Sequence, residues 1–208
     1  EDQDGGNTYN VAIGFSAGAE VTTGERNTLI GGFTGDAITS ASYNVAIGYE
    51  ALSSEDTGNQ NVAVGYRALK DLDAGANANN VAVGYLAGEN ITTGIFNNII
   101  GSNAGDALTT GTRNIAIGYN ALSSEDAHGR NVAIGHNALF ALDAGVDSYN
   151  VAIGYDTGVS ITTGLYNTVL GGLALDALTT GSENVAIGYQ ALTSADSNEA
   201  RNVAIGSY

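Results

Sequence analysis

The apolar residues of this chain fall in short runs that alternate with a period of two. In the segment Val11-Ala12-Ile13, the two β-branched side chains would point to one side of an extended backbone and Ala12 to the other. β-branched residues favour strands, and the Gly14 that follows would interrupt a helix. The pattern predicts an all-β chain built from short strands and frequent turns.

Each apolar run belongs to a pentapeptide, Asn-x-x-(Ile/Val/Leu)-Gly, that recurs every 17 to 19 residues. Repeats this short are typical of a solenoid, in which each coil buries its faces against its neighbours. The repeated asparagines are Asn10, Asn27, Asn44, Asn61, Asn80, Asn97, Asn114, Asn131, Asn150, Asn167, Asn184 and Asn202. We therefore predict one domain over residues 1–208, a single parallel β-solenoid (β-roll) of about twelve coils of 17–19 residues.

A longer period of 70 residues groups the coils in fours. The blocks are 10–79, 80–149 and 150–208, and residues 1–9 form a partial coil. A 17-residue coil has a path of at most about 56 Å, which fits two short strands and two turns. Twelve coils stacked about 4.8 Å apart would make a rod about 58 Å long.

Positions that repeat in every coil have structural interpretations, counted here as offsets from the asparagine. A column of stacked asparagines can pass hydrogen bonds from coil to coil as a structural ladder. The glycine at offset +4 is expected in a turn that a Cβ would forbid. Offset +5 is often tyrosine, as at Tyr49, Tyr66 and Tyr85, and these rings are predicted to stack along one edge of the rod.

Both faces of the predicted strands are apolar. Offset +2 is Ala in most coils but Leu29, Ile99 or Val169 in the second coil of each block, and the residues on either side of it are also mostly apolar. One face must fill the coil, and a second or third chain is the simplest cover for the other. The sequence thus predicts self-association, as a homotrimer or another oligomer.

The two ends of the chain match partial coils of the same type and carry no capping sequence. Bare solenoid ends would expose strand edges that pair readily with another chain. Two interpretations stay open: the chain is a stretch of a longer repeat protein, or copies stack end to end into a filament.

Composition narrows the possible partners. The chain has 208 residues with 30 Gly and no Cys, and a formal net charge of −16. An acidic surface repels phosphate backbones and anionic head groups, so nucleic acid is not an expected partner. No apolar run approaches the roughly 20 residues of a spanning helix, so membrane insertion is not expected either.

The sequence contains only weak matches to catalytic motifs. Gly14-Phe15-Ser16-Ala17-Gly18 matches a nucleophile elbow, but the offset of Ser16 carries unrelated residues in other coils and no helix is expected to follow. His128 and His136 are each replaced in equivalent coils, so both are interpreted as surface residues. We predict no enzyme activity and no catalytic or cofactor-binding residues.

The acidic turns are candidate metal sites. Offset +12 is aspartate in the third and fourth coils of the blocks, and neighbouring coils would place two carboxylates about 5 Å apart, close enough to share Ca²⁺. The alternative is a solvated acidic edge that prevents sheet aggregation. The residues are Asp56, Asp73, Asp126, Asp143 and Asp196.

The pentapeptide Asn-Val-Ala-Ile-Gly at 10–14, 44–48, 150–154 and 184–188 resembles the head repeat of YadA-type trimeric autotransporter adhesins. This resemblance implies a left-handed parallel β-roll that assembles as a homotrimer on a bacterial surface. The strings at 44–52 and 184–192 are also similar to repeats in phage tail-fibre proteins.

Together, the repeat and the resemblance predict an extracellular structural or adhesive rod, on a cell or virion surface, that contacts a host-surface or glycan receptor. A tail-fibre shaft is one alternative. A glycan- or ice-binding module that uses the tyrosine or threonine columns is another.

Overall fold

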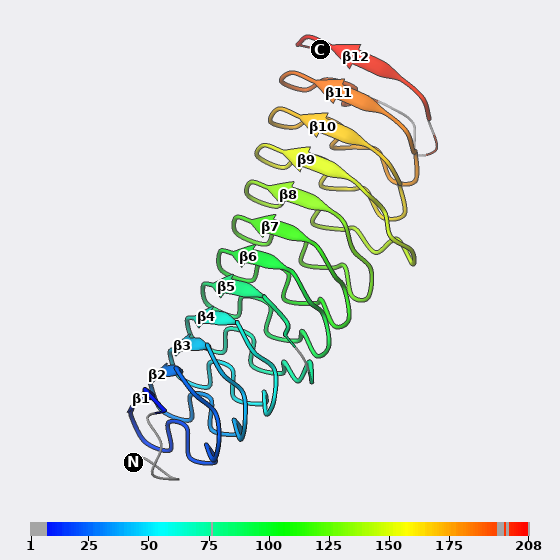
Figure 1. Ribbon diagram of the computed structural model, residues 1–208. Coiled ribbons are helices and arrows are strands. Elements are labelled where there is room, and N and C mark those ends of the chain that lie inside the picture. The colour runs from blue at the N-terminus through cyan, green and yellow to red at the C-terminus, as the bar shows by residue number, and fades with distance from the viewer. Residues whose placement is uncertain (1–7, 76, 195–197, 199, 208) are drawn as a thin grey trace.

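The computed structural model describes residues 8–75, 77–194, 198 and 200–207, and over them the chain forms one parallel β-solenoid (Figure 1). The predicted fold class is confirmed. The strands are β1 (Val11–Ile13), β2 (Thr28–Ile30), β3 (Val45–Ile47), β4 (Val62–Val64), β5 (Val81–Val83), β6 (Asn98–Ile100), β7 (Ile115–Ile117), β8 (Val132–Ile134), β9 (Val151–Ile153), β10 (Thr168–Leu170), β11 (Val185–Ile187) and β12 (Val203–Ile205).

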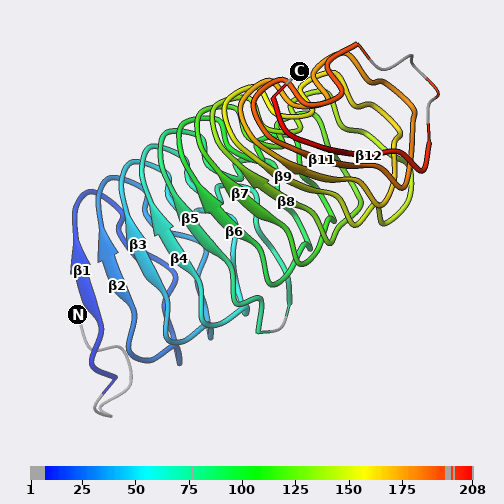
Figure 2. The ribbon, with the colours of Figure 1, turned by 90° about the horizontal axis from the view of Figure 1, so that it is seen from above.

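The strands form a single sheet in chain order from β1 to β12, each parallel to the next. Pairing joins equal offsets: Val11 lies opposite Thr28, and Ala12 opposite Leu29. Because no register shift accumulates, residues of equal offset form columns along the rod. Figure 2 shows the strands side by side along the stack of coils.

The middle residue of each strand points into the coil. Leu29, Ile99 and Val169 are fully buried, as are the alanines at the same offset from Ala46 to Ala186. Side chains at offset +11 pack near them inside the coil. Ile38 and Leu29, for example, both border Gly35, because a Cβ added to this glycine would lie 2.9 Å from Ile38 Cδ1 and 2.9 Å from Leu29 Cδ2. Burying each large aliphatic side chain stabilises the fold by about 1.5–3 kcal/mol. The Val/Ile side of the strand therefore faces outward.

The described part of each coil contains one strand, and the second strand expected from the path length is absent. The backbone bends repeatedly outside β1 to β12, because residues such as Tyr43, Glu50 and Leu52 adopt positive φ values of 63°, 51° and 53°. Coils still exchange backbone hydrogen bonds there, as from Leu52 N–H to the Ala68 carbonyl at 3.0 Å. Over the described residues, no helix is long and apolar enough to cross a membrane.

The glycine that follows each strand allows the coils to approach closely. Gly101 has φ 135°, and a Cβ built on it would lie 2.3 Å from the carbonyl oxygen of Gly118 in the next coil. Such a contact is far inside van der Waals distance, so only glycine fits this column. The invariant Asn-x-x-x-Gly spacing thus reflects the packing of coil on coil.

Candidate functional site

The repeated asparagines form a buried ladder. Asn10 Oδ1 accepts the backbone N–H of Asn27 at 2.8 Å, and the same bond recurs at every step up to Asn202, whose N–H donates to Asn184 Oδ1 at 2.9 Å. Each side chain thus supplies the acceptor for a backbone donor in the next coil. The column is structural, since buried polar groups are held by being hydrogen-bonded.

The side-chain nitrogen of these asparagines mostly bonds within its own coil. Asn97 Nδ2, for example, donates to the Gly111 carbonyl at 2.8 Å. The longer fourth coils of the first two blocks change this pattern: Asn131 Nδ2 reaches the Gly129 carbonyl at 3.4 Å, and Asn61 Nδ2 has no hydrogen-bond partner among the described residues. The ladder therefore runs through side-chain oxygen to backbone N–H.

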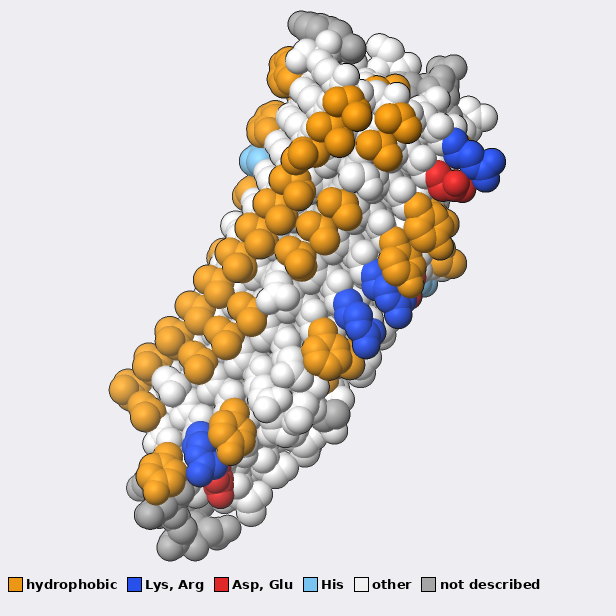
Figure 3. All heavy atoms as spheres, turned by 45° about the horizontal axis from the view of Figure 1, so that its top comes forward, with side chains coloured by type: hydrophobic (Ala, Val, Ile, Leu, Met, Phe, Trp, Pro, Cys, Tyr) orange, Lys and Arg blue, Asp and Glu red, His pale blue; other side chains and the backbone are white. Residues whose placement is uncertain are grey.

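The outer side of the sheet is an uncharged apolar strip. Its last column is Ile, Val or Leu in every strand, and its first column is Val or Ile except at Thr28, Asn98 and Thr168. Ile100 in β6 is 40% exposed, and Leu170 in β10 is 45% exposed. Figure 3 shows these side chains as adjoining orange rows along the rod. We call this surface, the first and third residues of β1 to β12, the apolar strip.

A second column combines arginine with aromatic rings. It consists of the residues that directly precede the repeated asparagines. Within it, Arg26 Cζ lies 5.7 Å from the ring centroid of Tyr9 and 5.3 Å from that of Tyr43. Arg113 and Arg130 make similar contacts with aromatic rings. Four of the six basic residues lie in this column, which we call the basic edge: Arg26, Arg113, Arg130 and Arg201.

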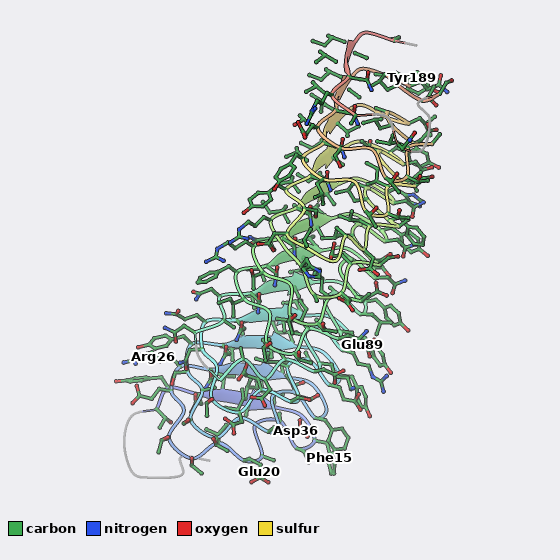
Figure 4. The ribbon with its side chains drawn as sticks, turned by 90° about the vertical axis from the view of Figure 1, so that its right-hand side faces the viewer. Phe15, Glu20, Arg26, Asp36, Glu89 and Tyr189 are labelled. Carbon is green, nitrogen blue, oxygen red and sulfur yellow. The ribbon has the colours of Figure 1, made fainter. Side chains whose placement is uncertain are left out.

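Acidic side chains gather on the other side of the rod. Figure 4 shows Asp36 and Glu89 on the side opposite Arg26. Burial raises the pKa of Asp36, with Glu50 adding to the rise through charge repulsion, and one oxygen of Asp36 has no hydrogen-bond partner within the described chain. Two basic residues also lie among these carboxylates, where Arg67 pairs with Glu50 and Lys70 with Asp71.

The predicted tyrosine stack is confirmed in part of the rod. Tyr49 and Tyr66 have ring centroids 5.7 Å apart, and Tyr66 and Tyr85 5.3 Å apart, with planes within 12° of parallel. The stack stops at Ser102, which occupies the same offset. Because neighbouring rings cover each other's faces, mainly their edges remain open, whereas stacking on a ligand requires an exposed face.

His136 stands in a comparable stack further along the rod. Its ring centroid lies 5.2 Å from those of Tyr119 and Tyr155, and its Nδ1 lies 3.4 Å from Asp156 Oδ1. Ser16, the nucleophile-elbow candidate, has φ 54°, the left-handed conformation that Glu50 also adopts at this offset. The Gly-x-Ser-x-Gly match therefore marks a turn of the coil.

Two buried glutamates were missed by the sequence interpretation. Glu55 is fully buried at offset +11; its Oε1 accepts the Gly58 N–H at 2.6 Å and its Oε2 accepts the Ala74 N–H of the next coil at 3.4 Å. Burial raises the pKa of Glu55, and the nearby Asp73 carboxylate adds to the rise. This carboxylate closes its own turn and ties it to the following coil.

Glu125 occupies the equivalent turn of the second block, but its contacts differ. It is fully buried, Oε1 accepts the His128 N–H at 3.2 Å, and Oε2 has no hydrogen bond among the described residues. His128 Nδ1 lies 3.4 Å from Glu125 Oε1. Burial raises the pKa of Glu125, while the adjacent imidazole opposes the rise.

The repeat contains a sequence signal that both glutamates are buried. Offset +11 is Val, Ile or Leu in every other coil up to Leu178, so a glutamate there replaces a core residue. Counting offsets beyond the pentapeptide would have marked Glu55 and Glu125 as buried charges. His128 was interpreted as a surface residue, yet it is only partly exposed and contacts a buried carboxylate.

The aspartates proposed for Ca²⁺ lie on the surface. Asp56, Asp73, Asp126 and Asp143 are all exposed, and Asp196 lies outside the described residues. Of the four described, only Asp126 belongs to a set of three ligating side chains close enough to share an ion, with Glu125 and His128. The threonines at the same offset donate their hydroxyls to carbonyls of the next coil, as from Thr92 to Thr109 at 3.2 Å.

The chain matches no protein-family model, and no curated protein or solved structure has detectable similarity to it. The likeness to adhesin heads therefore rests on the pentapeptide and its spacing.

Proposed function

We propose that the protein is a non-catalytic, extracellular structural or adhesive rod that self-associates through the apolar strip. The single observation that carries this proposal is the strip itself, which runs over all strands from β1 to β12 without a charged residue. The resemblance to adhesin heads supports a trimer and a place on a cell surface. A tail-fibre shaft requires the same physical properties, so it differs only in what the rod is attached to.

The size of the strip supports association. A sheet about 58 Å long, presenting two side-chain rows about 10 Å wide in all, exposes about 600 Å² of apolar surface. Monomeric proteins rarely present contiguous apolar patches larger than a few hundred Å². Covering the strip against one or two other copies would bring the buried area per chain into the range of stable interfaces.

Charge also favours this surface over the others. A chain of net charge −16 repels its own copies, which opposes contact through the acidic side. The strip carries no charge, and most of the basic residues lie in the separate column before each asparagine. Association through the strip therefore meets less repulsion than association through the acidic side.

Light scattering coupled to gel filtration tests the proposal. Ile100→Lys places a charge at an exposed position in the middle of the strip, in β6. An oligomer that buries the strip would have to bury this ammonium group, so we expect the oligomer to dissociate into monomers. The unmodified chain should elute as an oligomer with the mass of three chains.

Ser102→Lys is the matched control. It adds the same charge to the same coil, at an offset where other coils accommodate tyrosine, and should leave the oligomer intact. Circular dichroism checks that both variants keep the β-solenoid, and Ile100→Thr provides a milder second variant. A monomeric unmodified chain, or an oligomer that Ile100→Lys does not weaken, would overturn the proposal.

A further inference from the structure

One turn of the second block brings three different metal-ligating side chains together. Glu125, Asp126 and His128 each offer a ligand atom, and these atoms all lie within 4.8 Å of one another. Among the described residues, no other set of three carboxylates or imidazoles is this close. The set arises within four consecutive residues, so it forms whenever the turn forms.

The buried glutamate gives an independent reason to expect a ligand. Glu125 has no exposed surface, and its Oε2 makes no hydrogen bond within the described chain. The Ala144 N–H lies near enough to favour the carboxylate form, but not in hydrogen-bond geometry. A buried carboxylate oxygen without a partner is costly, and a bound cation would remove that cost.

The equivalent turn of the first block shows how the unpaired oxygen arises. There, both oxygens of Glu55 are hydrogen-bonded, and residue 58 is glycine. A Cβ at Gly58 would lie 2.4 Å from Glu55 Oε2. His128 places a Cβ at this position in the second block, so the carboxylate cannot keep the same arrangement. The substitution removes a hydrogen bond and supplies an imidazole in its place.

The spacing of the ligand atoms suits a small cation. His128 Nδ1 and Glu125 Oε1 are 3.4 Å apart. Two ligands at tetrahedral angles on Zn²⁺, with bonds of about 2.1 Å, are separated by about 3.4 Å. His128 Nδ1 also has no hydrogen-bond partner among the described residues, so its lone pair is available to a metal.

The backbone of the turn is held in place independently of any metal. The His128 carbonyl accepts a bond from Asn114 Nδ2 at 3.1 Å, and the Gly129 N–H donates to Asp147 Oδ1 at 3.0 Å in the next coil. The coil of His128 and the next coil thus fix the position from which the imidazole projects. Such preorganisation lowers the ordering cost of binding.

We infer that Glu125, Asp126 and His128 form a binding site for one divalent transition-metal ion of the Zn²⁺ class. Imidazole together with carboxylate is typical of Zn²⁺ and its first-row neighbours, whereas Ca²⁺ prefers a shell of oxygen ligands only. The exposed Asp126 lies toward solvent, where water can complete the coordination. The first and third blocks lack the site, since they carry Gly58 and Ala195 where the second block has His128 and Glu125.

Titration calorimetry with ZnCl₂ tests the inference on the full chain, prepared without a histidine tag. We expect one Zn²⁺ per chain and a higher melting temperature with Zn²⁺ than with EDTA. His128→Gly restores the residue of the first block, so it should fold, and should weaken Zn²⁺ binding about tenfold or more. Co²⁺ should give visible absorption bands that His128→Gly abolishes.

His136→Ala is the matched control, because it removes the other histidine, which faces one carboxylate, and should leave Zn²⁺ affinity unchanged. Glu125→Gln is a second ligand variant that keeps the side-chain volume, and it should also weaken binding. Absence of Zn²⁺ binding, or binding that His128→Gly leaves unaltered, would overturn the inference and leave Glu125 and His128 as an ion pair. Oligomeric state, read by light scattering, tests the proposed function separately.

Discussion

Two turns with the same Ser-Ser-Glu-Asp sequence, at 53–56 and 123–126, differ in what their glutamates do. Glu55 makes one hydrogen bond within its turn and one to the next coil, whereas Glu125 makes only the first. The residue three positions later, Gly58 or His128, accounts for the difference. A repeat protein can therefore convert a structural group into a candidate ligand with one substitution, because the surrounding coils keep the backbone in place.

The sharpest test of this difference is to replace each glutamate with the core residue found at the same offset in other coils. Glu55→Leu leaves the N–H groups of Gly58 and Ala74 unpaired, and we expect it to lower the free energy of unfolding by about 2 kcal/mol. Glu125→Leu leaves only the His128 N–H unpaired, so its cost should be about 1 kcal/mol or less. Urea denaturation of both variants in EDTA measures the two costs, and equal losses would contradict the comparison.

A change of pH is expected to have an intermediate effect on the free energy of unfolding. Burial raises the pKa of both Glu55 and Glu125 above the ordinary value of 4.5. A folded-state pKa above the unfolded value means that the stability from each group is complete below about pH 4.5 and is lost as pH rises through the folded-state pKa. The free energy of unfolding should therefore rise as pH falls through the folded-state pKa values toward about 4.5.

Glutamine variants assign this pH dependence to each turn. Glu55→Gln and Glu125→Gln should each flatten the profile, because each removes a carboxyl group whose pKa is raised by burial. Urea titrations at several pH values measure the slopes. Asp36 and Asp106 have raised pKa values for the same reason of burial, so some dependence should remain in both variants. A stability that falls steadily on acidification would contradict the expected sign.

The smallest effect concerns the exposed aspartates that follow the glutamates. Asp56→Asn and Asp126→Asn remove a charge from equivalent surface positions, so each should change the stability of the metal-free protein by no more than about 0.5 kcal/mol. Only Asp126→Asn should also weaken Zn²⁺ binding in calorimetry. If both variants weakened it alike, the metal would be held by the exposed aspartates in general and the two turns would not differ.

Much of the architecture followed from the sequence because it depends on repetition. The Asn-to-Gly spacing predicted a parallel β-solenoid, and the glycine column has a clear reason in the contact between Gly101 and the Gly118 carbonyl. The prediction of a second strand in each coil was wrong, because a path length does not reveal that residues such as Glu50 adopt left-handed backbone angles. The arginine-aromatic column was missed because its members are chemically varied.

The candidate metal site could not be predicted in the same way. The sequence interpretation placed carboxylates in pairs across coils, at Asp56 with Asp73, whereas the close set of ligands lies within one turn. Glu125 and His128 are ordinary residues for a surface turn when considered singly. Their significance depends on distances of a few ångströms between side chains, which no periodicity encodes.

The sequence by itself determined the period, the parallel stacking and the columns of like residues, because a coil that recurs with constant spacing can satisfy its backbone only by pairing with its neighbours. Tertiary structure decided which strand face is inside: the small alanines leave room for Leu29, Ile38 and their equivalents to meet within the coil, so the bulkier Val and Ile side chains are left outside. It also decided that Glu125 is buried with one oxygen unpaired, because that depends on the Cβ of His128 and the packing of adjacent coils.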